Sequence, residues 1–280
     1  MLAMNILGVG NYMEGTSLNL NNLFMFALIF GFAGSFISLA MSKFMAKMST
    51  GAKVIEVARN SDEQWLLDTV ARHAAKAGIK TPEVAIYNSP QPNAFATGMT
   101  KNKSLVAVST GLMRSMRQNE VDAVLAHEVA HVANGDMVTM ALLQGVLNTF
   151  VIFFAKIVAY VVDRVILKNE ESGHSWTFII VDIVAQIFFG ILASTIAMWF
   201  SRKREFHADN GGAYLAGKEN MIAALRRLQT MQPGELPDQI AAFGISSGGS
   251  KFGKLFMSHP PLEERIAALE ATSQSELKVA

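Results

Sequence analysis

Cysteine is absent from this chain of 280 residues, and charged residues are few, at 17% of the composition. The lack of cysteine excludes disulfide bonds and thiolate zinc sites, which leaves histidine and carboxylate side chains as the only good metal ligands. Positive and negative side chains nearly cancel, with 24 Lys and Arg against 23 Asp and Glu. The net charge of +1 gives no reason to expect nucleic acid or a strongly acidic partner.

Apolar residues are abundant instead, with a hydrophobic composition of 51% and a mean hydropathy of +0.28. These values are high for a soluble domain and low for a pure transporter, and they suit a protein divided between membrane and water. Three segments are long enough to span a bilayer, at 23–41, 138–162 and 177–200. The middle segment carries Lys156, so a buried amphipathic helix is the alternative there, because lysine reaches water only near an interface.

Basic residues cluster after the first and the last of these segments. Since Lys and Arg that flank a span tend to stay on the cytoplasmic side, we expect residues 42–137 and 201–280 to face the cytoplasm. The segment 1–22 and the loop 163–176 should lie on the other side. The apolar start of the chain is too short to cross about 30 Å of hydrocarbon, and one hypothesis is that 1–22 holds the remnant of a missing first span. The basic residues are Lys43, Lys47, Lys53, Arg59, Arg202, Lys203 and Arg204.

The sequence His-Glu-Val-Ala-His begins at His127 and lies in a stretch of helical character. Residues four apart on a helix share one face, so His127 and His131 can bind the same Zn²⁺. Glu128 is then close enough to take a proton from a metal-bound water, which is the role of the glutamate in an H-E-x-x-H zinc protease. The motif therefore predicts metal-assisted hydrolysis.

A zinc protease of this kind needs a third protein ligand and keeps its fourth position for water. Glu205 and Asp209 are also four residues apart and share a helix face. One carboxylate would bind the metal, and the other would hold a ligand histidine through its second ring nitrogen. The alternative is a solvated run of charges at 202–209.

The water-facing part is typical of a small α+β domain. An exposed strand in such a domain can hold an extended substrate by backbone pairing, without reading its sequence. Small side chains at Ala94 and Ala96 would let a peptide lie close, and ordinary packing within the sheet is the alternative explanation. The predicted elements are a helix at 62–77, strands at 83–88, 94–97 and 104–109, a turn at 99–103 and a helix at 262–271.

Five blocks of the sequence, in this order, are similar to those of a known protease family. They are NAFATG at 93–98, LVAVSTGL at 105–112, HEVAHVANGD at 127–136, SRKREFHAD at 201–209 and FMSHPPL at 256–262. With these blocks, nearly the whole chain resembles the HtpX-type heat-shock membrane zinc metalloproteases, which are relatives of the CaaX prenyl endoproteases.

The resemblance implies that His127, His131 and Glu205 bind one zinc ion and that Glu128 is the general base. It also implies that Asp209 supports a ligand from outside the first coordination sphere. It suggests a substrate-binding edge made of Asn93, Ala94, Phe95 and Ala96.

The resemblance also places His259 near the site. His259 precedes Pro260 and Pro261, so it is either a residue at the entry of the next helix or a donor to the oxyanion that develops during hydrolysis. His207 should point away from the metal, because it lies about 200° around the helix from Glu205.

We therefore expect a mainly α-helical membrane protein with a small α+β, gluzincin-like catalytic domain beside a short β-sheet. Its expected function is a zinc metalloendopeptidase of protein quality control in a bacterial inner (cytoplasmic) membrane. It would cleave misfolded or damaged membrane proteins and unfolded polypeptides at the cytoplasmic surface. The alternative is a catalytically inactive zinc-binding scaffold, against which the motif glutamate Glu128 argues. A metal transporter would need more ionisable residues in its spans, and the polar residues around the motif disfavour an intramembrane protease.

Overall fold

The computed structural model describes residues 12–14, 17–169, 175–231 and 259–279 of the chain. It divides into two compact units, each made of two stretches of sequence. Unit 1 contains residues 1–38 and 140–197, and unit 2 contains 39–139 and 198–280. Most of the predicted N-terminal segment 1–22 and part of the predicted loop 163–176 lie outside the described residues.

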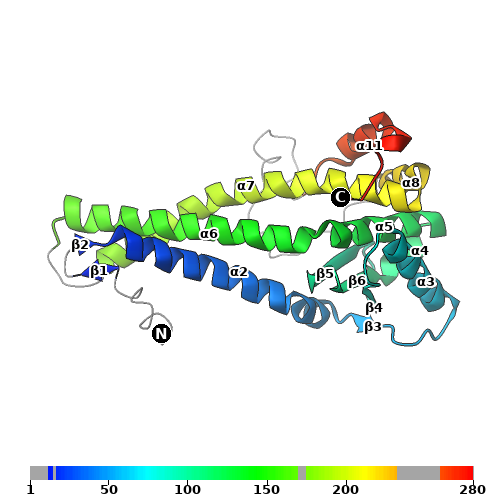
Figure 1. Cartoon of the computed structure of the whole chain (residues 1–280), viewed down its shortest axis with the longest axis horizontal. Coiled ribbons are helices and arrows are strands. Elements are labelled where there is room, and N and C mark those ends of the chain that lie inside the picture. Colours follow the sequence, from blue (N-terminus) through cyan, green and yellow to red (C-terminus); the bar gives the residue numbers. More distant parts are fainter. Residues whose placement is uncertain (1–11, 15–16, 170–174, 232–258, 280) are drawn as a thin grey trace. The chain divides into compact units, whose positions relative to one another are not determined.

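Long apolar helices build unit 1 (Figure 1). Within the described residues, three helices are long and apolar enough to cross a membrane, and they contain the predicted segments 23–41, 138–162 and 177–200. Each helix is longer than its predicted span, and the domain boundaries drawn from the sequence stay a prediction. The elements are β1 (Met13–Glu14), β2 (Ser17–Leu18), α2 (Leu20–Thr50), α6 (Asp136–Tyr160), the π-helical turn η1 (Val161–Ile166) and α7 (Trp176–Ala216).

The charge of Lys156 is paired inside unit 1. Its Nζ lies 3.1 Å from Oδ2 of Asp182, and Gln186 Nε2 donates to the same oxygen at 3.0 Å. Three aromatic rings surround the ammonium group with their centroids 5.5 to 5.7 Å away, which adds cation–π attraction. Lys156 therefore does not need to reach water, and the charge is no argument against a spanning helix. The rings belong to Tyr12, Phe26 and Phe178.

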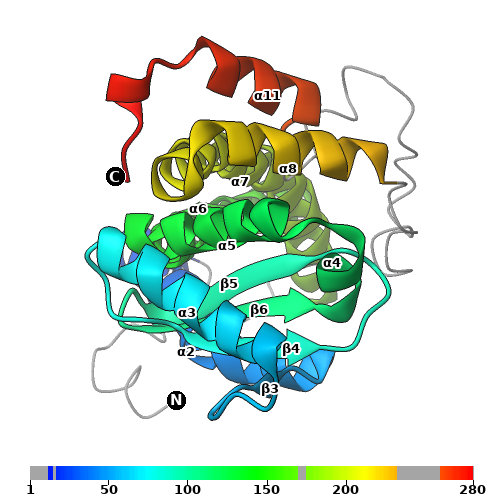
Figure 2. The same cartoon turned by 90° about the vertical axis from the view of Figure 1, so that its right-hand side faces the viewer.

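Unit 2 is a four-stranded sheet with helices packed on it (Figure 2). The strand order is β3-β4-β6-β5, with β4 parallel to β6 and the other two pairs antiparallel. Its elements are β3 (Lys53–Val54), α3 (Ser61–Lys76), β4 (Glu83–Tyr87), β5 (Ala94–Thr100), β6 (Lys103–Ser109), α4 (Thr110–Ser115), α5 (Gln118–Asn134), α8 (Lys218–Thr230), α11 (Leu262–Ala271) and the 3-10 turn η2 (Gln274–Glu276).

One apolar core holds unit 2 together. It joins buried side chains of α3, α5, α8 and α11 to one face of the sheet, and Leu66, Val106, Leu125 and Leu225 are fully buried in it. The other face carries a smaller cluster around Tyr87. The helix α5 lies at the centre of this core, so its position is fixed on several sides.

The predicted helices and strands of unit 2 are present, which confirms the fold class of a mainly helical chain with a small α+β part. The predicted turn at 99–103 was too long, because β5 continues to Thr100 and β6 begins at Lys103. The pairing of β5 with β6 shifts register between Gly98 and Thr100, as at a β-bulge, and β5 continues beyond this shift. Gly98 has a φ of +148°, and a Cβ there would meet the carbonyl oxygen of Lys103 at 2.3 Å.

We predict that Lys156→Met lowers the free energy of unfolding in detergent by about 3–5 kcal/mol, because it leaves the buried Asp182 without its partner. Lys156→Met combined with Asp182→Leu should recover most of this loss, since replacing both members of a buried pair is often close to neutral. Thermal unfolding of the three proteins measures the difference, with the exposed Lys203→Met as control. Equal midpoints for the single and the double variant would show that the pair does not hold the helices.

Candidate metal centre

The helix α5 presents its two motif histidines on one face. At its start the backbone N–H of Arg117 donates to Glu120 Oε2 at 2.7 Å, which satisfies one of the free N–H groups at the helix N-terminus. The imidazoles of His127 and His131 lie edge to face, with their centroids 4.6 Å apart and their Nε2 atoms 3.1 Å apart. Both side chains are largely buried. Two ring nitrogens thus point into the same small space, as the spacing of the motif predicts.

The end of α5 brings a carboxylate to the second histidine. Gly135 has a φ of +72°, a left-handed conformation that glycine adopts without a steric penalty. The chain turns there and starts α6 at Asp136, whose Oδ2 lies 2.5 Å from His131 Nδ1. Asp136 was not among the predicted site residues. A glycine followed by an aspartate just after the motif was the available signal.

The helix α7 brings Glu205 to the two imidazoles. Its Oε1 lies 3.4 Å from His131 Nε2, and its Oε2 lies 3.6 Å from His127 Nε2. One ligand atom from each of the three residues lies within 4.8 Å of the other two, so the group could hold a metal ion. Glu205 is only 2% exposed, which makes it part of the interior rather than of a solvated run of charges.

One turn further along α7, Asp209 lies behind the first histidine. Its Oδ1 is 3.0 Å from His127 Nδ1, and the residue is 1% exposed. Each histidine of the pair therefore has a carboxylate at Nδ1 and directs Nε2 toward Glu205. Carboxylates in this place fix the tautomer and the orientation of histidine ligands in metal sites.

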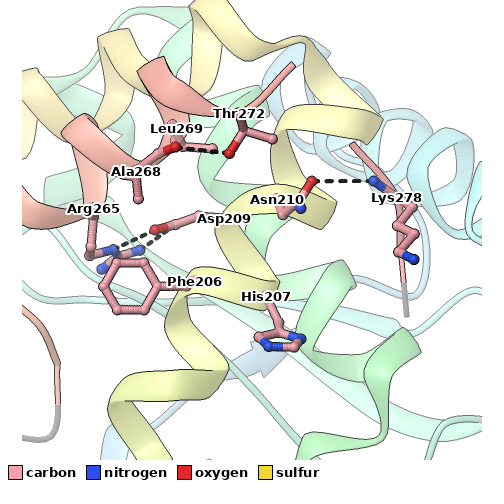
Figure 3. Close-up of a pocket in the computed structure, with 9 residues that line it drawn as sticks. All are labelled: Phe206, His207, Asp209, Asn210, Arg265, Ala268, Leu269, Thr272 and Lys278. Atoms are coloured by element: carbon pink, nitrogen blue, oxygen red, sulfur yellow. Dashed lines mark hydrogen bonds and ion pairs between the residues drawn. The ribbon is translucent and has the colours of Figure 1, made fainter. Parts of the chain in front are cut away.

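Arg265 is a member of the site that the sequence analysis missed. It lies on α11, is 7% exposed, and points at Asp209 (Figure 3). Its Nε and Nη2 donate to the two oxygens of that carboxylate at 2.7 and 2.6 Å. Its position could have indicated a buried charge, because it lies beside Ile266 and one turn before Leu269 on the apolar face of the predicted helix at 262–271.

The remaining predicted residues of the catalytic group lie around this cluster. Glu128 is partly buried on α5, between the two histidines in sequence. His259 has a side chain that is 64% exposed, and its Nδ1 lies 2.9 Å from Glu205 Oε2. The residue that caps α11 is Pro261, which makes no side-chain cap hydrogen bond. The structure thus brings His259 to the site and gives it no capping role at α11.

The predicted substrate edge is the outer strand of the sheet. β5 pairs with β6 along one side, and the part of the chain that the structure describes offers no strand on its other side. Asn93 is exposed, and its backbone pairs with Ser109. Ala94 and Ala96 are partly buried against the main core, so their small side chains serve the packing of the sheet on α5.

The buried groups fit a cation. Two imidazole nitrogens and a carboxylate are the donor types that zinc prefers. All three side chains are largely buried, and Glu205 Oε2 also lies within ion-pair distance of His259 Nδ1 and Arg265 Nη1. Burial alone lowers the pKa of His131, but hydrogen bonding to Asp136 and Glu205 outweighs it and raises that pKa to about 10. Without a metal, the raised pKa therefore favours a protonated His131 imidazole at neutral pH.

Residues 60–273 match the model of peptidase family M48. The chain is 79% identical to "Protease HtpX" of Hydrogenovibrio crunogenus, over 100% of this chain and 94% of that protein. It is 63% identical to "Protease HtpX" of Thioalkalivibrio sulfidiphilus, over 96% and 92% of the two chains.

Among solved structures, the chain is similar to the crystal structure of S. mikatae Ste24p. The TM-score is 0.64 at 20% identity, over 88% of this chain and 58% of that one. At this level of identity the likeness concerns the fold alone.

We predict that the metal-free chain binds Zn²⁺ more tightly as the pH rises from about 6.5 to about 10. The pKa of His131 rises from 6.5 to about 10 in the metal-free fold, so a proton must leave when the metal binds. The apparent association constant should grow about tenfold per pH unit for each displaced proton. Since the folded pKa is the higher one, this proton stabilises the metal-free fold fully below pH 6.5, and that stability is lost toward pH 10.

Titration calorimetry in two buffers of different ionisation enthalpy, at about pH 7.5, counts the protons released. Zinc binding without proton release, and with an affinity independent of pH, would contradict this prediction.

Proposed function

Because the chain belongs to peptidase family M48, it is a metalloprotease, and we propose that it cleaves misfolded or damaged membrane proteins at the cytoplasmic surface of a bacterial inner membrane. The family match confirms the resemblance to HtpX-type proteases on which the sequence analysis drew. The observation that carries the proposal is the buried group of His127, His131 and Glu205 beside the partly exposed Glu128.

We propose one Zn²⁺ per chain, held by Nε2 of His127, Nε2 of His131 and the carboxylate of Glu205. The donor types support this, and so does their burial at mutual distances that a single ion could bridge. A bound zinc ion would supply a Lewis acid, which would lower the pKa of water toward neutrality and polarise the scissile carbonyl. Asp209 and Asp136 keep the two imidazoles in the tautomer that leaves Nε2 free.

Glu128 is the proposed general base. It takes a proton from the attacking water and returns it to the leaving amine. Its place on α5 supports this role, because it lies next to a proposed ligand in sequence and is less buried than the ligand. Its negative charge also contributes to the raised pKa of His131, which indicates that the two groups are close.

We propose that His259 donates to the oxyanion that forms on the scissile carbonyl. Two observations support the role, since its Nδ1 lies within 2.9 Å of Glu205 and most of its side chain is open to solvent. An extended substrate would pair with the free side of β5 at residues 93–96, where the edge of the sheet packs against the motif helix α5.

The length of α7 supports delivery of substrate at the membrane surface. Trp176 and Trp199 are exposed at the two ends of its apolar stretch, 81% and 55% respectively, as aromatic residues are at membrane interfaces. Their separation on the helix is about 35 Å, close to the roughly 30 Å of a hydrocarbon core. Glu205 follows Trp199 on the same helix by about 9 Å.

We predict that Glu128→Gln keeps zinc and loses proteolysis by at least about 10²-fold, because the amide preserves the shape of the side chain and cannot accept the proton. Zinc content and cleavage of an unfolded protein should be measured for the full chain in detergent. Glu219→Gln, an exposed change on α8, is the control and should leave both unchanged. Normal cleavage by Glu128→Gln would rule out this mechanism, and an inactive parent chain that binds zinc would favour a scaffold.

The proposed orientation can be tested with single cysteines, because the chain has none of its own. We predict that a cysteine at Leu167 reacts with an impermeant thiol reagent added to intact cells. Cysteines at Ser61 and Ala271 should react only after the membrane is broken. The physical reason is the excess of Lys and Arg after the first and last spans. If the cysteine at Ser61 were labelled in intact cells and the cysteine at Leu167 were protected, the topology would be the opposite of the one proposed.

A further inference from the structure

Two carboxylates are buried one helical turn apart on α7. Glu205 is 2% exposed and Asp209 is 1% exposed, and both lie on the side of the helix that faces α5. Two like charges in the interior disfavour each other's ionised form unless an opposite charge compensates them. A metal ion held by Glu205 would compensate that carboxylate, whereas Asp209 faces Nδ1 of His127 instead.

Arg265 supplies the missing charge with its whole guanidinium group. Nε and Nη2 form two parallel hydrogen bonds with Asp209, and Nη1 lies 3.2 Å from Glu205 Oε2. A bidentate pair of this kind fixes direction as well as charge, which a lysine ammonium cannot do. One side chain thus links the two carboxylates that the histidines face.

We infer that Arg265 is a positioning residue for the metal centre, which acts through Asp209 and Glu205. The inference rests on the proposed function. Through Asp209, Arg265 sets the direction of the oxygen that faces His127 Nδ1 at 3.0 Å, and thereby the direction of His127 Nε2. Through Glu205, it holds the carboxylate that faces both imidazoles. The metal centre therefore depends on α11, a helix that carries none of the proposed ligands.

The surroundings of Arg265 make this role testable by chemical rescue. The Arg265–Asp209 pair borders a cavity of about 270 Å³, which Phe206, Asn210 and Leu269 also line (Figure 3). Truncation to alanine would open a guanidinium-sized space beside this existing cavity. A small guanidinium ion from solution then has a route to Asp209. The helix α11 itself keeps its anchors in the core, Ile266 and Leu269.

The experiment compares the full-length chain with Arg265→Ala, Arg265→Lys and Arg226→Ala in detergent. Arg226 is the matched control, because it forms an exposed ion pair with Glu270 of the same helix α11 at 2.7 Å. Zinc affinity is measured by competition with a chelator, and the visible spectrum of the Co²⁺-loaded protein reports the ligand geometry. Cleavage of an unfolded protein is followed in parallel.

We expect Arg265→Ala to weaken zinc binding by roughly 10- to 100-fold, the range for residues that support metal ligands, and to change the Co²⁺ spectrum. Millimolar guanidinium should restore affinity and spectrum, whereas the same concentration of ammonium should not. Arg265→Lys should remain impaired, and Arg226→Ala should match the parent chain. Adding Asp209→Ala to Arg265→Ala should weaken binding little further, because the two residues act through each other.

Parent-like zinc affinity in Arg265→Ala would overturn the inference. If that variant does not fold, Arg265→Lys decides, since a folded lysine variant with parent-like affinity and spectrum also overturns it. If ammonium restored the zinc affinity of Arg265→Ala as well as guanidinium does, Arg265 would supply only a positive charge. That result would overturn its role as a positioning residue. Failure of the parent chain to bind zinc would instead reject the proposed function, so the two failures are distinguishable.

Discussion

The cost of burying ionised groups is the constraint on which the metal centre depends. A charge in the interior destabilises the fold by several kcal/mol unless a partner of opposite charge and well-placed hydrogen bonds compensate it. The centre contains three largely buried carboxylates, on Asp136, Glu205 and Asp209. Each one faces a histidine, and Arg265 faces two of them. The positions of α5, α7 and α11 in unit 2 are therefore tied together by charge as well as by their shared apolar core.

The same constraint shapes unit 1, where less water is expected. Lys156 and Asp182 compensate each other within the bundle. Asp163 is fully buried, and it accepts hydrogen bonds from Ser175 Oγ at 2.5 Å and from Asn169 Nδ2 at 3.2 Å. Arg164 Nε lies 3.3 Å from the other oxygen of Asp163. The charged side chains named here are few, and each lies close to a group of opposite charge.

The sequence predicts the local parts of this protein well, because those parts depend on short-range rules. Helix periodicity is sufficient to place α3 and α11, and the spacing of four residues brings His127 and His131 together. A spacing of four on a second helix also puts Glu205 and Asp209 on the same helix face. Periodicity and spacing do not identify partners on different elements, so the grouping of Glu205 with the two histidines came from the family resemblance, and Arg265 and Asp136 were missed. Arg265 reaches Asp209 from 56 residues away, and Asp136 depends on the left-handed turn at Gly135.

Arg265 also explains how the centre can exist with and without a metal ion. In the metal-free fold, the raised pKa of His131 means that a proton supplies positive charge beside Glu205. If a cation took that place, the proton would leave, but the guanidinium would stay paired with Asp209 and close to Glu205. Since one compensating charge is permanent, the two carboxylates on α7 need not separate during the exchange. A site arranged in this way would be preorganised for a metal ion, because the direction of the proposed ligands is set by groups that the ion would not displace.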